Sequence, residues 1–434
     1  MFTYYCNLAL RSFRRNKVLT ALMVLAIALG IGASMTTLTV FHVLSGDPIP
    51  GKSERLFHVQ LDPELLAGYT PGDEPQQDLN RYDGETLLQQ KQGKRQALMT
   101  GGSVTVEPAG GALKPFMLDA RYTTPDFFAM FEVPFLFGRA WSANDDIAQA
   151  RVVVIAKTLN DKLFNGVDST GKTLRVDGHD LQIVGVIDDW NPKPLFYDLN
   201  VGIYNTTEQV FEPFQTAIGL SQDRSGSMNC YGQVATVDGT ARDAPCAWTQ
   251  YWVELDSASK ASDYKAYLDR YSQQQKDAGR YQRPPNTRLR DVMDWLDYHG
   301  AVPGDVRLQL WLAMGFLLVC LVNTVGLLLA KFLRRSGEIG VRRALGASRT
   351  EIFKQCLVEA GSIGLAGGVL GLGLAQLGLW AVRHRPTGYA ALAHLDLSML
   401  MATFALAIVA SLLAGLLPAW RAMQITPAVQ LKTQ

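Results

Sequence analysis

The sequence has almost no net charge, because 41 Lys and Arg residues are balanced by 40 Asp and Glu residues over 434 positions, giving +1. A balanced charge supplies no basic field that would favour a nucleic acid as partner. The sequence also lacks a G-x-S-x-G elbow and an H-E-x-x-H pair. Its histidines are few and scattered, at His42, His58, His179, His299, His384 and His394. We therefore expect no catalytic site, no cofactor and no metal ion.

Two acidic pairs, Asp145–Asp146 and Asp188–Asp189, are the remaining candidates for acid–base chemistry. Neighbouring residues in a strand point to opposite faces, so such a pair does not place two carboxylates together. We interpret both pairs as solvated turns.

What the sequence does have is long apolar segments, concentrated towards its two ends. Four of them reach the roughly 20 residues needed to cross a bilayer, at 18–44, 306–333, 356–382 and 397–420. The first is too long for the apolar core of a signal peptide, and no A-x-A-like cleavage site follows a short core, so we expect it to be retained. The sequence predicts a membrane protein with four transmembrane α-helices.

Basic residues predict the orientation, because Lys and Arg are retained on the cytoplasmic side. They precede the first span and crowd the connection between the second and third spans, at Arg11, Arg14, Arg15, Lys17, Lys331, Arg334, Arg335, Arg342, Arg343, Arg349 and Lys354. We therefore expect both termini in the cytoplasm. The predicted order is an interfacial helix (1–17), the first span, an outer domain (45–305), the second span, a cytoplasmic loop (334–355), the third span, an outer loop (383–396), the fourth span and a cytoplasmic tail (421–434).

The outer domain reads as mixed α/β. Residues 126–131 are predicted to be helical, and 151–164 a strand followed by a short helix. Two alternating segments around Asp177–Gly178 predict a β-hairpin. The polar segment 257–297 is predicted to be helix-prone. The fold class is therefore four transmembrane helices with a large α/β domain inserted between helices 1 and 2.

The segment GVDSTGKT (166–173) matches the phosphate-loop pattern G-x-x-x-x-G-K-[ST]. A phosphate loop must follow a buried strand and begin a helix, so that backbone N–H groups face the phosphates. Here a predicted helix precedes Gly166 and a predicted strand follows, on the side of the membrane away from ATP. We interpret the segment as a turn that leads into the hairpin.

The five cysteines are divided between the predicted outer domain and the membrane or cytoplasmic segments. Cys230 and Cys246 lie in the outer domain, whereas Cys6, Cys320 and Cys356 lie in membrane or cytoplasmic segments. Thiols outside the cytoplasm tend to pair. A Cys230–Cys246 disulfide is favoured over two free thiols.

The loop between spans two and three, SGEIGVRRALGASRTEIFKQCLVEA (336–360), combines apolar and basic residues. Gly346 is predicted to end a short amphipathic helix, and Ser348 with Glu351 three residues on forms a capping box for the next. The short helix could anchor the span or dock a cytoplasmic partner, and its chemistry alone favours neither. Glu359, one turn inside the third span, is expected to reach water or Arg342 and Arg343 as an ion pair or cap rather than a proton relay.

Small residues on the third span, Gly364, Gly367, Gly368 and Gly371, form overlapping small-xxx-small patterns that permit close helix contact. The pattern leaves open whether this contact lies within the subunit or across a dimer.

Four segments of the sequence together resemble one family of membrane proteins. The segment GEIGVRRALGASRTEIFKQCLVEA is similar to the signature of the MacB/FtsX-like permease family of ABC transporters. The N-terminal LALRSFRRNKVLTALMVLAIALGIG, the hairpin GKTLRVDGHDLQIVGVIDD and the tail LAGLLPAWRAMQITPAVQLK resemble that family's opening, periplasmic hairpin and closing segments, in the expected order.

The resemblance implies a non-catalytic permease with a coupling helix at about 337–346, and we assign coupling to Glu338, Ile339, Arg342, Arg343 and Gly346. About 17 residues precede the first span, so we expect the ATPase on another polypeptide. The implied function is export or extraction of a drug, peptide or lipoprotein, driven by periplasmic shape change. The alternative is a division-type regulator of periplasmic cell-wall hydrolases.

The expected partners are the cytoplasmic ATPase, a second or homologous permease copy, membrane lipids, and a periplasmic adaptor with an outer-membrane channel. The implied location is the bacterial inner membrane.

Overall fold

The computed structural model describes residues 17–108, 113–232, 238–385, 388–395 and 397–424. Its internal contacts divide the chain into two compact units, a helical unit formed by Met1–Ser45 with Val302–Gln434 and an α/β domain formed by Gly46–Ala301. Residues 1–16 of the predicted interfacial helix and 425–434 of the predicted tail lie outside the described residues.

The helical unit contains four helices long and apolar enough to cross a membrane: α2 (Lys17–Leu44), α10 (Gly304–Arg334), α12 (Arg349–Arg383) and α13 (Leu397–Met423). The described residues of this unit also form a short helix, α11 (Ser336–Ala344), and a 3-10 turn, η2 (Ala390–Leu392). The α/β domain enters the chain between α2 and α10, so the predicted fold class is confirmed.

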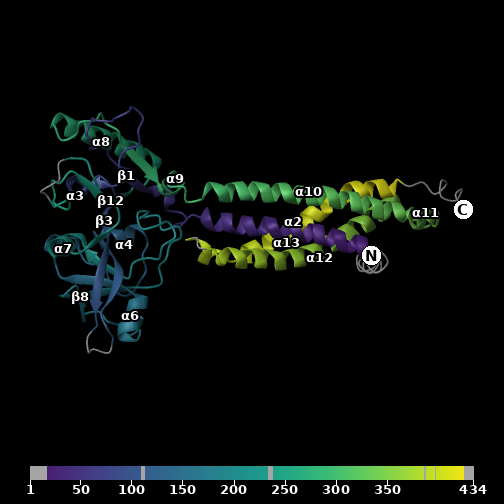
Figure 1. Cartoon of the computed structure of the whole chain (residues 1–434), viewed down its shortest axis with the longest axis horizontal. Helices are drawn as coiled ribbons and strands as arrows, with labels where there is room; N and C mark the ends of the chain where they lie inside the picture. The colour runs from purple at the N-terminus through teal and green to yellow at the C-terminus, as the bar shows by residue number, and fades with distance from the viewer. Residues whose placement is uncertain (1–16, 109–112, 233–237, 386–387, 396, 425–434) are drawn as a thin grey trace. The chain divides into compact units, whose positions relative to one another are not determined.

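The four long helices pack side by side, with α2 and α13 each contacting both α10 and α12 (Figure 1). Glycines on α12 allow this helix to approach α13 and α2 closely. A Cβ atom added at Gly364 would lie 2.1 Å from Ser411 Oγ on α13, and one at Gly367 would lie 2.6 Å from Ile27 Cγ2 on α2. The small-residue pattern therefore serves contacts within the chain, which answers the question left open by the sequence.

The third long helix begins at Arg349, seven residues before the predicted start of the span at 356. Ser348 accepts the Glu351 backbone N–H and Glu351 accepts that of Ser348, so the predicted capping box is confirmed. Gly346 has a φ of +102° and ends the preceding turn after α11. The helix thus includes a polar first turn, which hydropathy alone assigns to the loop.

The described part of the α/β domain forms a 13-stranded mixed sheet with the main order β13-β1-β12-β3-β4-β9-β6-β8-β5. Most neighbours are antiparallel, while β4–β9 and β6–β8 are parallel. The strands are β1 (Leu56–Gln60), β2 (Leu79–Asn80), β3 (Arg95–Glu107), β4 (Phe116–Thr123), β5 (Phe135–Gly138), β6 (Val152–Ala156), β7 (Thr173–Val176), β8 (His179–Ile187), β9 (Val210–Pro213), β10 (Arg224–Ser225), β11 (Asn229–Cys230), β12 (Cys246–Glu254) and β13 (Arg288–Asp291).

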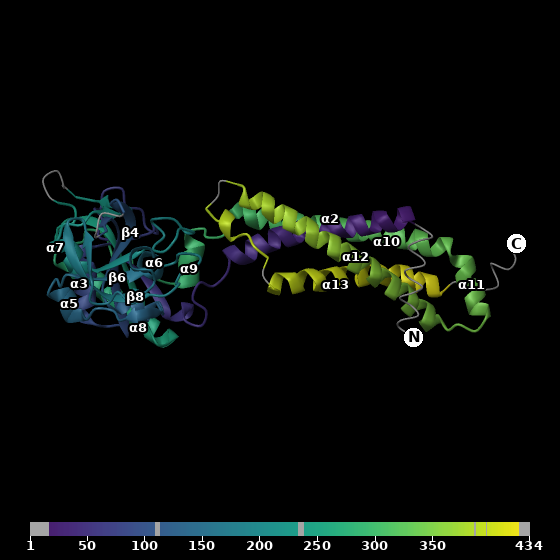
Figure 2. The ribbon, with the colours of Figure 1, turned by 90° about the horizontal axis from the view of Figure 1, so that it is seen from below.

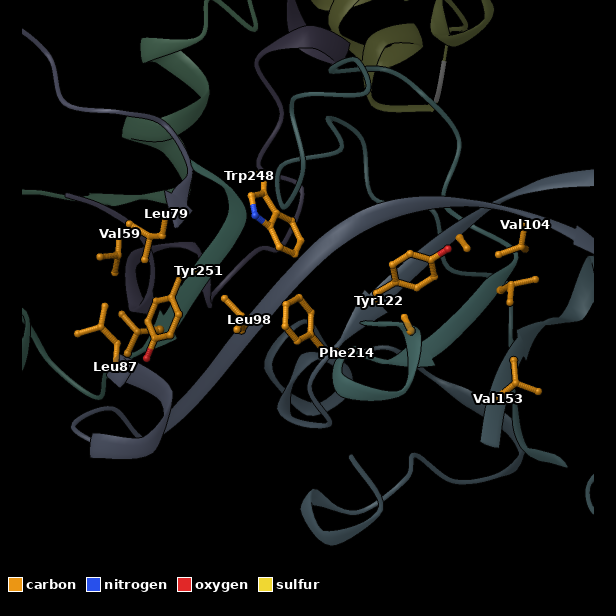
Figure 3. Close-up of a cluster of buried hydrophobic side chains, with 14 of the residues drawn as sticks. Val59, Leu79, Leu87, Leu98, Val104, Tyr122, Val153, Phe214, Trp248 and Tyr251 are labelled. Carbon is orange, nitrogen blue, oxygen red and sulfur yellow. The ribbon is translucent and has the colours of Figure 1, made fainter. Parts of the chain in front are cut away.

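Both faces of the central strands β12, β3 and β9 are largely buried, because side chains that alternate along a strand enter two different cores. Tyr251 and Leu98 belong to one apolar cluster, which Figure 3 shows together with Trp248, Phe214 and Tyr122. Trp252, the neighbour of Tyr251, belongs to the second cluster. All nine residues of β12 are buried as a result.

Helices cover the sheet: α3 (Arg81–Gln90), α4 (Asp126–Met130), α5 (Ala143–Ile147), α6 (Lys157–Phe164), α7 (Phe214–Gly219), α8 (Ala258–Asp277) and α9 (Val292–Tyr298), with a 3-10 turn, η1 (Ser53–Arg55). The predicted helix at 126–131, strand and helix at 151–164, and hairpin are confirmed. The hairpin turns at Asp177 and Gly178 with φ values of +46° and +76°. The segment 257–297 is only partly helical, because Arg288–Asp291 pairs with β1 as an edge strand.

Cys230 and Cys246 face each other across β11 and β12 and are joined by a disulfide. Cys320 and Cys356 are free and buried in the helical unit.

Candidate functional site

The helix α11 lies across the end of the helical unit, between the end of α10 and the start of α12 (Figure 2). It is amphipathic in an unusual way, because its charged residues face the bundle and part of its apolar surface faces outward. These two faces define the candidate site.

The inward face of α11 is held by ion pairs. Arg335, at the junction with α10, approaches Glu338 to 3.2 Å, and Arg342 approaches the same carboxylate to 3.1 Å. Arg342 also donates to Gln355 Oε1 on α12 at 3.0 Å. Ile339 is buried beneath these groups. The helix is therefore fastened to both neighbouring long helices.

A buried ionic cluster continues from this face into the bundle. Glu359 on α12 receives Lys331 Nζ at 2.7 Å and Arg335 at 3.0 Å, one on each carboxylate oxygen. Lys331 is fully buried and also lies 3.2 Å from Thr20 Oγ1 on α2. The cluster links α2, α10, α11 and α12.

This cluster corrects the expected surroundings of Glu359. The residue is 2% exposed, so it does not reach water. Its cationic partners are Lys331 from α10 and Arg335 directly after α10, in place of the expected Arg342 and Arg343. The interpretation of Glu359 as a structural ion pair agrees with this geometry.

The outward face of α11 carries Val341, which is 56% exposed, and Leu345 just beyond its end, which is 83% exposed. Gly346 is also exposed and has no atom within 4 Å of an added Cβ. Exposed apolar side chains at a helix end rimmed by charges are typical of a protein contact surface.

The five residues predicted for coupling therefore divide into two groups. Gly346 lies on the open face, whereas Glu338, Ile339 and Arg342 face inward, and Arg343 donates to the backbone carbonyl of Met423 at 3.4 Å. Lys331 and Arg335 were predicted only to set the orientation, and their pairing with Glu359 was not predicted. A lysine inside an apolar span together with Glu359 was the available signal, because buried charges in a membrane segment require partners.

The phosphate-loop match is a turn, as predicted. The helix α6 precedes it and the strand β7 follows it. Ser169 donates to Asn160 Oδ1 at 2.6 Å, and Lys172 Nζ lies 4.9 Å from the centre of the Phe164 ring. The loop is therefore hydrogen-bonded to α6, and its lysine packs on an aromatic ring of the same helix.

Across the described residues, no group of three or more His, Cys, Asp or Glu side chains is arranged to hold a metal ion.

Four candidate membrane helices with an α/β domain inserted between the first two define the class of multi-pass membrane proteins with a large extramembrane domain. The chain belongs to the MacB/FtsX-like permease family of ABC transporters. Residues 20–271 match the MacB-like periplasmic core domain, and residues 311–427 match the FtsX-like permease C-terminal domain.

Curated relatives agree with this family. The macrolide export ATP-binding/permease protein MacB of Azoarcus sp. (strain BH72) is 24% identical over 435 residues, which cover 98% of this chain and 59% of the relative. The pyoverdine export ATP-binding/permease protein PvdT of Pseudomonas aeruginosa is 24% identical over 429 residues, covering 96% and 57%. The chain thus spans about three-fifths of the length of these relatives.

Among solved structures, the periplasmic region of MacB from Actinobacillus actinomycetemcomitans aligns with a TM-score of 0.37 and 13% identity. The alignment covers 59% of this chain and 97% of that one.

Proposed function

We propose that this chain is the permease part of an ABC transporter in which an ATPase pushes on α11. The four long helices transmit this movement to the α/β domain, and the change of shape drives export. The observation that carries the proposal is that α11 has two different faces. Glu338 and Arg342 attach one face to the bundle, and Val341 and Leu345 are exposed on the other. A helix that transmits force needs both a contact surface and a rigid attachment.

The cargo we propose is a small organic molecule, because the relatives named above export a macrolide and pyoverdine. The working assembly we propose contains two permease copies, with a periplasmic adaptor and an outer-membrane channel as further partners. A division-type regulator is the alternative, and its partner would be a cell-wall hydrolase.

The proposed location is the bacterial inner membrane, with α11 and both termini on the cytoplasmic side. The Lys and Arg residues that gather around α11 support this orientation, since basic residues are retained in the cytoplasm. A reporter fused after Lys432 should report the cytoplasm and one inserted within 51–297 the periplasm. A periplasmic signal from the C-terminal fusion would contradict the orientation.

The test of coupling is a charge placed on the open face of α11. We expect Val341→Asp and Leu345→Asp to abolish co-purification of the ATPase and the substrate-stimulated part of ATP hydrolysis, because a carboxylate would be desolvated in an apolar contact. Val167→Asp is the matched control, since Val167 in the α/β domain has the same 56% exposure as Val341. Thermal melting in detergent checks that each variant is folded.

Mass spectrometry of the purified wild-type complex identifies the partner. An ABC ATPase that is lost from both α11 variants and kept by the Val167 variant supports the proposal. Normal ATPase binding and transport by a folded Val341→Asp/Leu345→Asp double variant would remove α11 as the coupling element. A hydrolase bound in place of an adaptor would favour the division-type alternative.

A further inference from the structure

The α/β domain contains a cavity of about 420 Å³ lined by α3, α5 and the segment that leads into β3. Its apolar lining includes Leu88, Pro125 and Ile147, and its polar lining includes Asp146. Ile147 is 77% exposed at the surface, whereas Asp146 is only 6% exposed. Cavities of this size, with apolar walls and a few fixed polar groups, are typical of sites for small organic molecules.

The position of Asp146 differs from its sequence interpretation as a solvated turn. It lies in α5, which Ser142 caps through the neighbouring Asp145, and the helical turn directs Asp146 inward. Its Oδ1 accepts the backbone N–H of Gln215 at 2.9 Å, which orients the carboxylate. Within the described part of the chain, no Lys, Arg or His nitrogen lies within 4.0 Å of this carboxylate.

The negative charge of Glu85, the second buried acid of the cavity, is balanced by two arginines. Its oxygens receive Arg81 Nε at 2.7 Å, Arg242 Nε at 2.8 Å and the Gln215 side chain at 2.9 Å. Burial and the nearby Glu85 together raise the pKa of Asp146 to about 6. Asp146 is therefore mostly ionised at neutral pH, and none of the cations that the structure describes is paired with it.

The other charged residues of the lining do not supply that cation. Lys94 is paired with Asp256 at 2.6 Å, and Arg95 is paired with Glu254 at 2.7 Å. Lys91 is exposed at the end of α3, in a left-handed conformation with a φ of +48°. Asp126, also exposed, accepts the backbone N–H of Gln96 at 3.0 Å. Of the two buried carboxylates in the described lining, Glu85 is paired with arginines and Asp146 is the one without a cation.

We propose that this cavity binds an organic amine whose ammonium group pairs with Asp146 and whose apolar part lies against Leu88, Pro125 and Ile147. An ammonium ion next to a buried carboxylate gains more from the pairing than it would in water, because the surroundings are less polar. An uncharged or acidic ligand of the same shape gains only the apolar contact or is repelled. The proposal concerns ligand binding to the α/β domain and is independent of whether α11 couples to an ATPase.

The experiment uses the full chain in lipid nanodiscs and three probes of one shape, 4-phenylbutylamine, 4-phenylbutanol and 4-phenylbutanoate. Binding is measured by isothermal titration calorimetry at pH 7.5. We expect the amine to bind at least about tenfold more tightly than the alcohol and the acid, a factor that corresponds to about 1.4 kcal/mol. Partition into the lipid is common to all protein variants and cancels when they are compared.

Three variants locate the site. Asp146→Asn should remove the preference for the amine over the alcohol. Ile147→Lys, at an exposed position, should block the amine by placing its own cation beside Asp146 without disturbing the fold. Asp189→Asn is the control, because it removes a carboxylate that is 76% exposed elsewhere in the same domain. Thermal melting confirms that each variant is folded.

The pH dependence provides an independent readout. The amine remains protonated below pH 7.5, so its affinity should fall as Asp146 takes up a proton below about pH 6. The alcohol should bind equally at pH 7.5 and pH 5. Equal affinity for all three probes, no binding of any probe, or an Asp146→Asn variant that keeps the amine preference would each overturn the proposal.

Discussion

The buried pair Lys331–Glu359 allows a quantitative test of how the helical unit is held together. The two charged atoms lie 2.7 Å apart, and the side chains are 0% and 3% exposed. Removing one partner of such a pair leaves a buried charge and costs about 3–5 kcal/mol, whereas replacing both by uncharged groups costs much less. The two substitutions should therefore be strongly non-additive.

The experiment is a double-mutant cycle with Lys331→Met, Glu359→Gln and the double variant, followed by unfolding of the helices in mixed micelles of increasing SDS content. We expect Glu359→Gln, which removes the carboxylate shared by Lys331 and Arg335, to lose about 3 kcal/mol of unfolding free energy. Lys331→Met leaves Glu359 paired with Arg335 and should lose less. The interaction free energy of the cycle should exceed about 1 kcal/mol, as for contacting residues in one ionic network.

The control cycle uses Lys265 and Asp269 on α8, which lie at the same distance of 2.7 Å but are 38% and 44% exposed. An exposed pair of this kind on a helix contributes about 0.3–0.5 kcal/mol, so its cycle, followed by melting of the α/β domain, should be nearly additive. An interaction free energy for Lys331–Glu359 no larger than the control value would refute the claim that this pair holds α10 and α12 together.

Three further predictions test other parts of the chain. Burial, with His299 and Arg290 nearby, holds the pKa of His58 well below its usual value, so the folded domain resists protonation and its melting temperature should fall as the pH drops below about 6.5. His58→Phe keeps the stacking on Trp295 and should flatten this pH dependence. Gly367→Ala should cost about 1–3 kcal/mol by forcing a Cβ against α2, while Gly373→Ala, with no atom within 4 Å of the added Cβ, should cost nothing in the same SDS assay. Reduction of the Cys230–Cys246 disulfide should lower the unfolding free energy by about 3 kcal/mol, and two alkylatable thiols in the unreduced protein would contradict the pairing.

Features that depend on nearby residues could be predicted from the sequence. The Asp177–Gly178 hairpin, the Ser348 capping box and the four apolar helices each rest on signals within a few residues or a single segment. The phosphate-loop match could be rejected for the same reason, since the order of helix and strand around it is a local property.

Features that depend on distant contacts could not be predicted. Glu359 is equally compatible with water, Arg342 or Lys331 until the helices are packed, and the packing brings in Lys331, 28 positions away. Arg288–Asp291 is polar and becomes a strand because β1 offers it an edge. Asp146 is part of an ordinary acidic pair, and only the packing of α5 against α7 buries it.

The ion pairs that attach α11 to the bundle explain why charge reversal on α11 would be a poor test of coupling. Glu338 and Arg342 neutralise each other at 3.1 Å and hold α11 to Arg335 and Gln355. Reversing either charge would detach α11 from α10 and α12 before any partner were involved, so loss of activity would not distinguish a broken contact surface from a broken attachment. Substitution at Val341 and Leu345 leaves the attachment intact, because both side chains are largely exposed and the ion pairs are made by other residues. A folded variant that fails there has lost a partner, and this is why the coupling proposal is best tested on the apolar face.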